Sequence, residues 1–376
     1  MRKIQMVDTK NQYLAIQKEV DEAIHEVLDS ASYINGKVVT NFSQHLGDYL
    51  NVKHVIPCAN GTDALQIAMM ALDLKPGDEV ITPSFTYIAT TEVVALLGLT
   101  PVFVDVDPIT FCMDVNSLKK AITPKTKAIV PVHLYGQAAP MEEILAVAKE
   151  HGIYVIEDNA QAIGCDYTFS DGTKKKTGTM GHIGATSFYP SKNLGAFGDG
   201  GAIFTNDDAL AQKMAMIANH GQSKRYYHDV VGCNSRLDSI QAAVLNIKLK
   251  HLDAYNAARQ KVAAFYNNAF ASLSQIITPS TASYTTHVFH QYTMQLKNID
   301  REAFIAHLAT HDVPCMIYYP VPGHLQKMFV HTNETQWNLQ VTDQLTPCVC
   351  SLPIHTEMDE TQLQHIATAV QSFFTK

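Results

Sequence analysis

Lys192 is the residue of this sequence whose surroundings most suggest covalent chemistry. It lies in a turn between two apolar, strand-like runs, 185–189 and 201–205. Four glycines let the backbone of this region turn sharply and approach a ligand closely: Gly195, Gly198, Gly200 and Gly201. A lysine amine attacks carbonyl groups when its site lowers its pKa. A surface lysine on a tight loop is the alternative, and this segment alone leaves both interpretations open.

The segment Asn60-Gly61-Thr62 has the pattern of an anion site. It follows a short apolar strand that starts at His54 and precedes a helix with apolar residues at helical spacing. The first N–H groups of a helix have no intrahelical acceptor, and the helix dipole is positive there. Thr62 adds a hydroxyl donor. An ordinary helix cap fits the segment equally well.

Tyr87 lies after the carboxyl end of a predicted strand at 79–82, and Asp158 is the last residue of a predicted strand at 153–158. Ligands collect at that edge of an open α/β sheet. An aromatic ring there can stack on a flat ligand, although core packing is the commoner role. A carboxylate at the end of a buried strand is costly without a partner. Asp158 therefore either faces a cation or a protonated ring nitrogen, or caps the next helix.

These residues are carried by strands that alternate with helices, which predicts an α/β fold with a mainly parallel sheet. A smaller α+β part follows, so we predict a large domain over 1–250 and a small C-terminal domain over 251–376. The expected helices are 11–32, 39–50, from about 86, 140–151, 207–220, from 232, 250–270, 300–310 and 359–374. The other expected elements are a hairpin insert within 165–183, a loop at 220–228, and strands at 127–136, 287–296 and 313–319.

The composition excludes several classes of protein. The 376 residues carry a net charge of -8, so no basic footprint for nucleic acid is present. The seven cysteines are scattered without a metal-binding spacing, which is typical of reduced thiols in the cytosol. The first residues contain no apolar signal-peptide core, and no run of about 18 apolar residues predicts a membrane span. We therefore expect a cytoplasmic protein without membrane or nucleic-acid partners.

Together, the four chemical features describe a site for pyridoxal 5′-phosphate (PLP). The phosphate needs N–H and hydroxyl donors, as at Gly61 and Thr62. The ring needs a stacking partner, as Tyr87 provides. The pyridinium nitrogen needs a carboxylate, here Asp158, and the aldehyde needs an amine, here Lys192.

Over almost its whole length the chain also resembles the nucleotide-sugar aminotransferases of the DegT/DnrJ/EryC1/StrS family, which have PLP fold type I. The matching stretches are 59–65, 77–83, 155–158, 187–195, 198–201 and 234–238. The resemblance implies that Lys192 forms the Schiff base with PLP, that Asp158 pairs with the ring nitrogen, and that Tyr87 stacks on the ring. It places Gln161, where many relatives have histidine, near the hydroxyl of the ring.

The same resemblance implies a homodimer with shared active sites. Gly61, Thr62 and Ser187 would hold the phosphate, and Asn234 would reach it from the neighbouring subunit. Arg236, two residues further on, would enter the same cleft, where its guanidinium suits a carboxylate. Alternatively, Arg236 forms a salt bridge at the subunit interface or binds the amino donor. Glutamate is the amino donor that the resemblance implies.

The substrate implied is a nucleotide-linked keto sugar. The stretch from Cys58 to Asp107 is most similar to enzymes of O-antigen synthesis that aminate C3 of UDP-2-acetamido-2-deoxy-3-oxo-glucuronate. Tyr318, Tyr319 and His324 are expected to contact the sugar, although many relatives have histidine at the position of Tyr318. The stretch 319–326 also resembles enzymes that aminate dTDP-3-oxo-6-deoxyhexoses, so that substrate stays an alternative. A PLP-binding regulator without turnover and a sugar dehydratase, in which a histidine would replace Lys192, are further alternatives.

Overall fold

The computed structural model describes residues 1–329 and 337–375. Its centre is a seven-stranded sheet in the order β1-β9-β8-β5-β4-β2-β3. The neighbouring pairs from β8 to β3 are parallel, and only β9 runs against its two neighbours. The strands are β1 (His54–Cys58), β2 (Glu79–Pro83), β3 (Thr100–Val104), β4 (Thr126–Ile129), β5 (Tyr154–Asp158), β8 (Ile183–Ser187) and β9 (Gly201–Thr205). The predicted α/β class with a mainly parallel sheet is confirmed.

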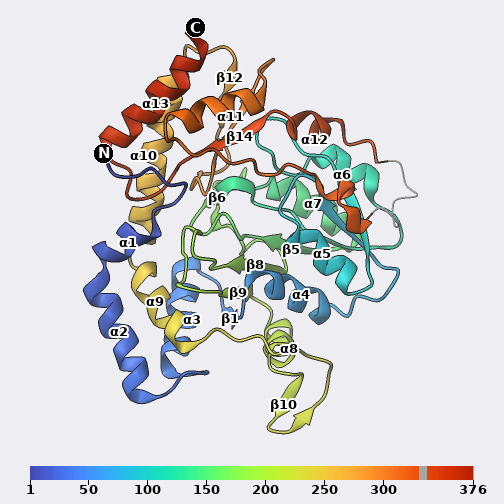
Figure 1. Cartoon of the computed structure of the whole chain (residues 1–376). Helices are drawn as coiled ribbons and strands as arrows, with labels where there is room; N and C mark the ends of the chain where they lie inside the picture. The colour runs from blue at the N-terminus through green and yellow to red at the C-terminus, as the bar shows by residue number, and fades with distance from the viewer. Residues whose placement is uncertain (330–336, 376) are drawn as a thin grey trace.

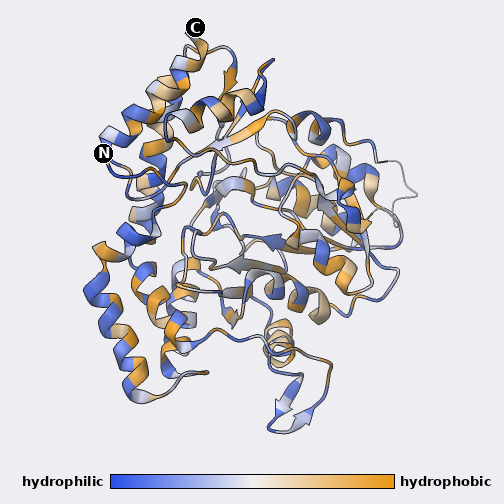
Figure 2. Ribbon diagram, in the orientation of Figure 1, coloured by the Kyte–Doolittle hydropathy of each residue, from blue (hydrophilic) through white to orange (hydrophobic). Residues whose placement is uncertain are grey.

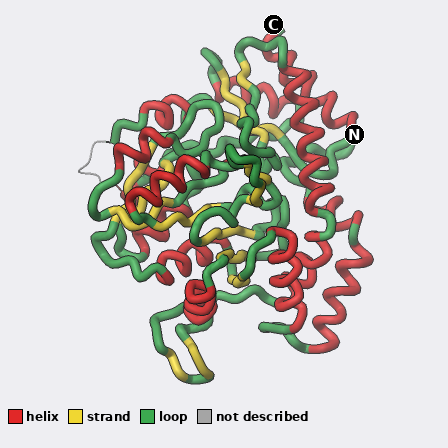
Figure 3. Tube along the Cα trace, turned by 180° about the vertical axis from the view of Figure 1, so that it is seen from behind, coloured by secondary structure: helices red, strands yellow, loops and turns green. Residues whose placement is uncertain are grey.

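Helices cover both faces of this sheet (Figure 1), and the strands are apolar on both sides for that reason. Val80 and Ile156 pack on the side of α4, α5 and α8, whereas their neighbours Ile81 and Val155 pack on the side of α6 and α7. Seen from behind, the strands lie between these helices (Figure 3). The helices are α4 (Gly61–Ala71), α5 (Ala89–Leu96), α6 (Val115–Ala121), α7 (Met141–His151) and α8 (Asp208–Ala218).

A second group of helices packs against the β1–β9 end of the sheet. Phe42 of α3 and Leu245 of α9 share a buried cluster with Phe204 of β9. The predicted helix over 11–32 is divided at Ile16, which ends α1 and precedes α2. These helices are α1 (Thr9–Ala15), α2 (Gln17–Ser30), α3 (Lys37–Leu50), α9 (Ser239–Leu249) and α10 (Leu252–Phe270).

The C-terminal part is built on a three-stranded antiparallel sheet. The N-terminal segment also belongs to this part (Figure 1), because Ile4 joins its core and the N–H of Ile354 donates to the Met6 carbonyl at 3.2 Å. The domain division at residue 250 stays a prediction. The elements are β12 (Ile276–Ile277), β13 (Tyr292–Leu296), β14 (Val349–Leu352), α11 (Arg301–Thr310), α12 (Gln340–Leu345), α13 (Glu360–Phe374) and the 3-10 turns η2 (Gly323–Leu325) and η3 (Lys327–Phe329).

Three predictions about local structure were wrong. The expected strand at 313–319 is irregular and makes one bridge, between Met316 and Ser351; Pro314 has no N–H to donate to a ladder. The polar segment 220–228 is not a loop but a short hairpin of β10 (Gln222–Lys224) and β11 (Tyr227–His228), hydrophilic for most of its length (Figure 2). The helix expected from residue 232 begins at Ser239 instead.

Other elements differ from prediction mainly in length. The hairpin insert is confirmed as β6 (Asp166–Thr168) and β7 (Lys174–Lys176). The strand expected over 127–136 is β4 followed by the 3-10 turn η1 (Leu134–Gly136), and the strand expected from 287 begins at Tyr292. Within the residues that the structure describes, no helix is long and apolar enough to span a membrane. All seven cysteines are free thiols.

Candidate active site

A cavity of about 720 Å³ lies at the carboxyl-terminal edge of the large sheet. Its lining comes from the strands β5 and β8, from the segments after β1, β2, β4, β5 and β8, and from residues 290–291 and 318–319 of the C-terminal part. Most of the predicted site residues line it: Gly61, Thr62, Tyr87, Asp158, Gln161, Ser187, Lys192, Tyr318 and Tyr319. The chain therefore brings both halves of its sequence to one site.

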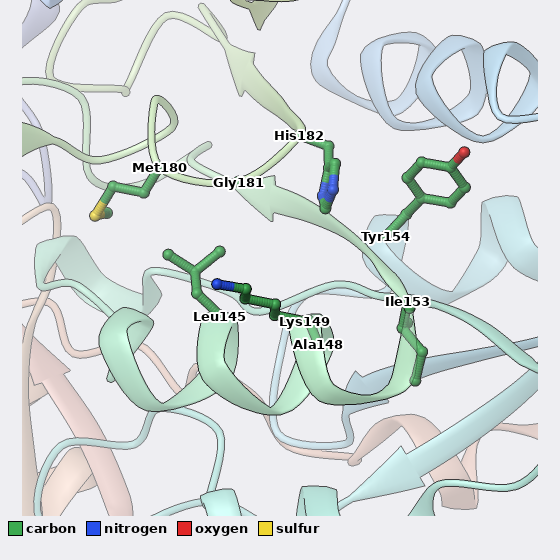
Figure 4. A pocket seen from close by; sticks show the side chains of 9 residues that line it. Leu145, Ala148, Lys149, Ile153, Tyr154, Met180, Gly181 and His182 are labelled. Carbon is green, nitrogen blue, oxygen red and sulfur yellow. The ribbon is translucent and has the colours of Figure 1, made fainter.

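Another hollow lies near the opposite edge of the sheet, where Tyr154 begins β5. Figure 4 shows it between α7 and the segment that leads into β8, with Lys149, Tyr154 and His182 around it. None of the predicted site residues lines this hollow. It lacks the helix N-terminus and the carboxylate that make the first cavity chemically distinctive.

The turn at Gly61 has the geometry of an anion cradle. Asn60 caps α4 by accepting from the N–H of Asp63 at 2.8 Å, and its carbonyl accepts from Ala64 at 3.1 Å. The N–H groups of Gly61 and Thr62, one step earlier, are thus left for a ligand. A side chain at position 61 would come within 2.6 Å of Ser187 Cβ, so only glycine lets β8 and this turn approach so closely.

Lys192 is held by hydrogen bonds on both sides. Its own N–H donates to the Tyr189 carbonyl at 2.8 Å, and the neighbouring Asn193 donates its side-chain amide to Asn256 at 2.7 Å and to the Val288 carbonyl at 2.9 Å. Burial lowers the pKa of the Lys192 amine to about 8, against the opposing effect of the Asp158 charge. A far larger share of the amine is neutral at physiological pH than in an ordinary lysine.

Asp158 is buried at the end of β5, with one side open to the cavity. Its Oδ2 accepts from the Thr90 hydroxyl at 2.8 Å, and its Oδ1 accepts from the N–H of Ala160 at 3.1 Å. A carboxylate so fixed can favour a positive charge in front of it. The contact with Ala160 shows that a turn-capping role coexists with this placement.

Gln161 and Tyr319 form one hydrogen-bonded unit. The Gln161 amide accepts from the N–H of Tyr135 at 2.7 Å and donates to the Tyr319 hydroxyl at 2.9 Å. The Tyr319 proton therefore remains available to the cavity. Burial raises the pKa of the Tyr319 phenol, which keeps that proton in place at neutral pH. The exposed ring of Tyr87 lies 5.9 Å from that of Tyr319, centroid to centroid.

Three predicted residues do not line the cavity of their own chain: Asn234, Arg236 and His324. His324 is buried and hydrogen-bonds to Ser84 at 2.8 Å, with Asp343 3.5 Å from its other ring nitrogen. Asn234 is exposed, in an extended segment where Cys233 and Ser235 donate to the last carbonyls of α8 at 2.8 and 2.9 Å. Those bonds explain why this segment does not continue into α9.

Sequence reasoning missed several residues of the cavity wall: Asp63, Thr86, Tyr189, Ser191, Asp199, His290 and Gln291. Within the part of the chain that the structure describes, three of the lining residues are acids, Asp63, Asp158 and Asp199, and Lys192 is the only lysine or arginine. An alternation of apolar residues made 287–296 resemble a strand, so nothing in the sequence marked His290 as part of a site.

The chain matches the DegT/DnrJ/EryC1/StrS aminotransferase family over residues 14–371. It belongs to this family. The aminotransferase is 46% identical to the UDP-2-acetamido-2-deoxy-3-oxo-D-glucuronate aminotransferase of Pseudomonas aeruginosa, over 98% of this chain and 99% of the relative. It is 44% identical to the UDP-N-acetyl-3-dehydro-alpha-D-glucosamine 3-aminotransferase of Acidithiobacillus ferrooxidans, over 98% of this chain and 97% of the relative. A pleiotropic regulatory protein of Geobacillus stearothermophilus is 42% identical, over 99% of this chain and 98% of the relative.

Solved structures agree in fold. DesV of S. venezuelae, in complex with a ketimine intermediate, superposes with a TM-score of 0.95 at 38% identity, covering 100% of both chains. NtdA of Bacillus subtilis, with bound cofactor PMP, superposes with a TM-score of 0.91 at 30% identity, covering 100% of this chain and 86% of that one. The protein is a PLP-dependent aminotransferase of nucleotide sugars.

The lining of the cavity fits this cofactor. A helix N-terminus with free N–H groups suits a phosphate, and glycine at position 61 lets Ser187 lie close to it, where a side chain would clash with Ser187. A fixed carboxylate at Asp158 suits a protonated ring nitrogen. An amine of lowered pKa at Lys192 suits an aldehyde. All three groups line one cavity.

Proposed function

We propose that the enzyme transfers the amino group of glutamate to C3 of UDP-2-acetamido-2-deoxy-3-oxo-D-glucuronate. The observation that carries this proposal is the 46% identity, across almost the whole of both chains, to the aminotransferase of that name. The cavity that unites Lys192, Asp158 and the α4 turn supports the chemistry. The amination would supply a diamino uronic acid for a surface polysaccharide such as O-antigen.

Each cofactor contact has a residue suited to it. Gly61, Thr62 and Ser187 would hold the phosphate, and Tyr87 would stack on the ring. Asp158 would hold the proton on the ring nitrogen, with Thr90 and the N–H of Ala160 fixing its two oxygens. Gln161 would position the Tyr319 hydroxyl, to which its amide donates. When bound, PLP supplies an electron sink for the carbon that gains or loses the amino group.

Lys192 would move the proton. Its Nζ, once free, can take a proton from the α-carbon of the amino donor and return one to C3 of the sugar. A pKa of about 8 suits both directions, because neither protonation state is rare near neutral pH. The hydrogen bonds of Asn193 to Asn256 and Val288 keep the lysine turn in place during the transfer.

Arg236 is proposed to bind the C6 carboxylate of the sugar, from the neighbouring subunit. Its half-buried guanidinium makes no ion pair within residues 1–329 and 337–375, although it is the kind of group that usually has a partner. Among the described residues, the cavity lining has three acids and one amine, so a cation donated by a neighbouring subunit would favour an anionic sugar nucleotide.

We expect a preference for the uronate of about 10- to 150-fold in kcat/KM over the C6-hydroxymethyl analogue, the span of a lost charge-assisted pair. Arg236→Ala should remove most of that preference, whereas Arg236→Lys should keep part of it because the charge remains. The measurement is kcat/KM for both UDP sugars, with single-turnover reaction with glutamate as the control that stays unchanged. Equal kcat/KM in the wild type, or a faster dTDP-6-deoxy sugar, would contradict the uronate assignment.

The homodimer with shared sites gives a separate prediction. Lys192→Ala and Asn234→Ala proteins, each inactive or weak alone, should recover about a quarter of wild-type activity when their subunits exchange at equal concentration. Half of the dimers are then mixed, and each mixed dimer has one intact site. The matched control mixes Lys192→Ala with Asp158→Asn. Each of these substitutions damages the cavity of the subunit that carries it, so a mixed dimer has no intact site and should stay inactive. Demonstrated exchange without recovery would refute sharing.

Two other functions have specific support. Amination of UDP-N-acetyl-3-dehydro-glucosamine is favoured by the 44% identical relative and is the outcome tested by the C6 comparison. A regulatory role without turnover is favoured by the 42% identical regulatory protein. The complete set of Lys192, Asp158 and the anion cradle argues for turnover, and incubation with glutamate and a panel of keto sugars, followed by mass spectrometry, tests this directly.

A further inference from the structure

Tyr135 is a buried residue directly behind the cavity, and each of its polar groups bonds to a residue of the cavity wall. Its N–H donates to the side-chain oxygen of Gln161 at 2.7 Å, and its carbonyl accepts from the N–H of Gln291 at 3.3 Å. Its hydroxyl donates to the carbonyl of Tyr318. Gln161, Gln291 and Tyr318 all line the cavity. One residue behind the lining thus holds three separate parts of it.

The backbone of Tyr135 has a conformation that is uncommon for a residue with a side chain. Its φ of 57° and ψ of 0° lie in the left-handed region. A residue other than glycine adopts this region at a cost, keeps it where its surroundings fix it, and is found there most often at functional sites. The bonds to Gln161 and Gln291 fix the two peptide groups on either side of Tyr135. The strained conformation is therefore held by the contacts to the cavity wall.

The bonds of Tyr135 form a closed loop that includes Tyr319. A backbone N–H can only donate, so the oxygen of the Gln161 amide faces Tyr135, and its nitrogen is left to donate to the Tyr319 hydroxyl at 2.9 Å. The Tyr319 oxygen accepts that bond, which leaves its proton for a ligand. The Tyr135 hydroxyl closes the loop at the peptide that joins Tyr318 to Tyr319. Burial holds the pKa of the Tyr135 phenol well above its usual range, so this hydroxyl keeps the proton that it donates.

We propose that Tyr135 is a positioning residue for the sugar and acts through Tyr319. Its hydroxyl fixes the peptide that precedes Tyr319, and its N–H, through Gln161, fixes the direction in which the Tyr319 hydroxyl donates. This rests on the proposed function, in which Tyr318 and Tyr319 contact the keto sugar. An arriving sugar oxygen then meets a donor that is already in place, and a contact ordered in advance costs less entropy to form.

The first test is Tyr135→Phe, which removes the hydroxyl but keeps the aromatic ring and the main-chain N–H. We expect KM for the keto sugar to rise about 10-fold with kcat within about 2-fold of wild type, as when a binding contact is lost. The single-turnover reaction with glutamate should also stay within about 2-fold, because the N–H still orients Gln161. The sugar is the UDP-3-oxo-uronate, or whichever keto sugar of the panel reacts fastest. An unchanged KM would overturn the proposal.

Tyr266→Phe is the matched control. The Tyr266 hydroxyl is also buried and also donates to a carbonyl, that of Pro353 at 2.9 Å, in the core of the C-terminal part. The control should lower the melting temperature by an amount similar to that of Tyr135→Phe and leave KM unchanged. An equal rise of KM in both variants would mean that a loosened core weakens sugar binding, and would refute positioning by Tyr135.

A double-mutant cycle decides whether Tyr135 acts through Tyr319. Tyr319→Phe removes the donor itself and should raise KM about 10-fold or more. Adding Tyr135→Phe should then raise KM by less than about 2-fold, because the position of a missing hydroxyl no longer matters. Two increases that multiply in full would contradict the proposal. If Tyr135→Phe does not fold, Gln161→Leu opens the same loop at its other link and takes the place of Tyr135→Phe in the cycle, with the same two outcomes.

Crystal structures of the wild type and of Tyr135→Phe, each loaded with PLP, give a readout that needs no substrate. In the variant the Tyr319 hydroxyl should move out of hydrogen-bond distance of Gln161, beyond about 3.5 Å. A Tyr319 hydroxyl that stays in its place would overturn the proposal. If no keto sugar of the panel is aminated by the wild type, the proposed function fails, while this comparison still decides the role of Tyr135.

Discussion

Replacing Lys192 by alanine should reduce turnover by about 10⁴-fold, because one substitution removes both the group that attaches the cofactor and the group that moves the proton. Borohydride treatment of the wild-type protein loaded with PLP should fix the cofactor on the peptide that contains Lys192. The same treatment of Lys192→Ala should leave the cofactor removable by dialysis. Peptide mass spectrometry measures both results.

Lys248 provides a strict control for this prediction. Burial, together with the charge of Arg259, lowers its pKa to about 8 as well, so a similar share of its amine is neutral, although the residue is only 1% exposed. It lies in α9, 5.5 Å from the centre of the Phe197 ring, and does not line the cavity. If a lowered pKa alone decided attachment, Lys248 would carry part of the adduct. An adduct on Lys248, or on any lysine other than Lys192, contradicts the assignment.

The part of the site that could be predicted from sequence lies at the ends of strands. Asp158, Lys192 and the turn at Gly61 each follow an apolar run, and parallel strands bring their carboxyl ends to one edge whatever the details of packing. The chemistry of each residue then specified its expected role. The structure places all three in one cavity, as this reasoning required.

The rest of the site could not be predicted from the sequence, because it depends on contacts between residues that are distant in the chain. His290 lines the site because Arg259 and Asn193 fix the segment around it, and neither bond follows from the local pattern. Residues 234–236 stay extended because their neighbours bond to the end of α8, which overrides the helical pattern further on. Propensity and periodicity describe neighbours in the chain, so tertiary hydrogen bonds of this kind lie outside their reach.

Asp158→Asn should reduce turnover by about 10²- to 10³-fold, the loss typical of a preorganised charge, while PLP stays bound. Asparagine has nearly the same shape as aspartate. Its Oδ1 can still accept from the N–H of Ala160, and the Thr90 hydroxyl can turn to accept from the new amide. The substitution thus removes the charge and preserves the capping bond. Steady-state kinetics, with the melting temperature as a check on folding, make the measurement.

Thr90→Val tests the hydrogen bond to Asp158 separately from the charge of Asp158. It removes the hydroxyl that donates to Oδ2 at 2.8 Å but leaves the carboxyl group itself in place, so we expect a loss of only about 10-fold. If Asp158 served merely to cap the turn at Ala160, Asp158→Asn would retain near-normal turnover, since that bond survives. Packing and hydrogen-bond geometry change less in Asp158→Asn than in Thr90→Val. A large loss of turnover in Asp158→Asn with a small loss in Thr90→Val is therefore the pattern that only a catalytic charge produces.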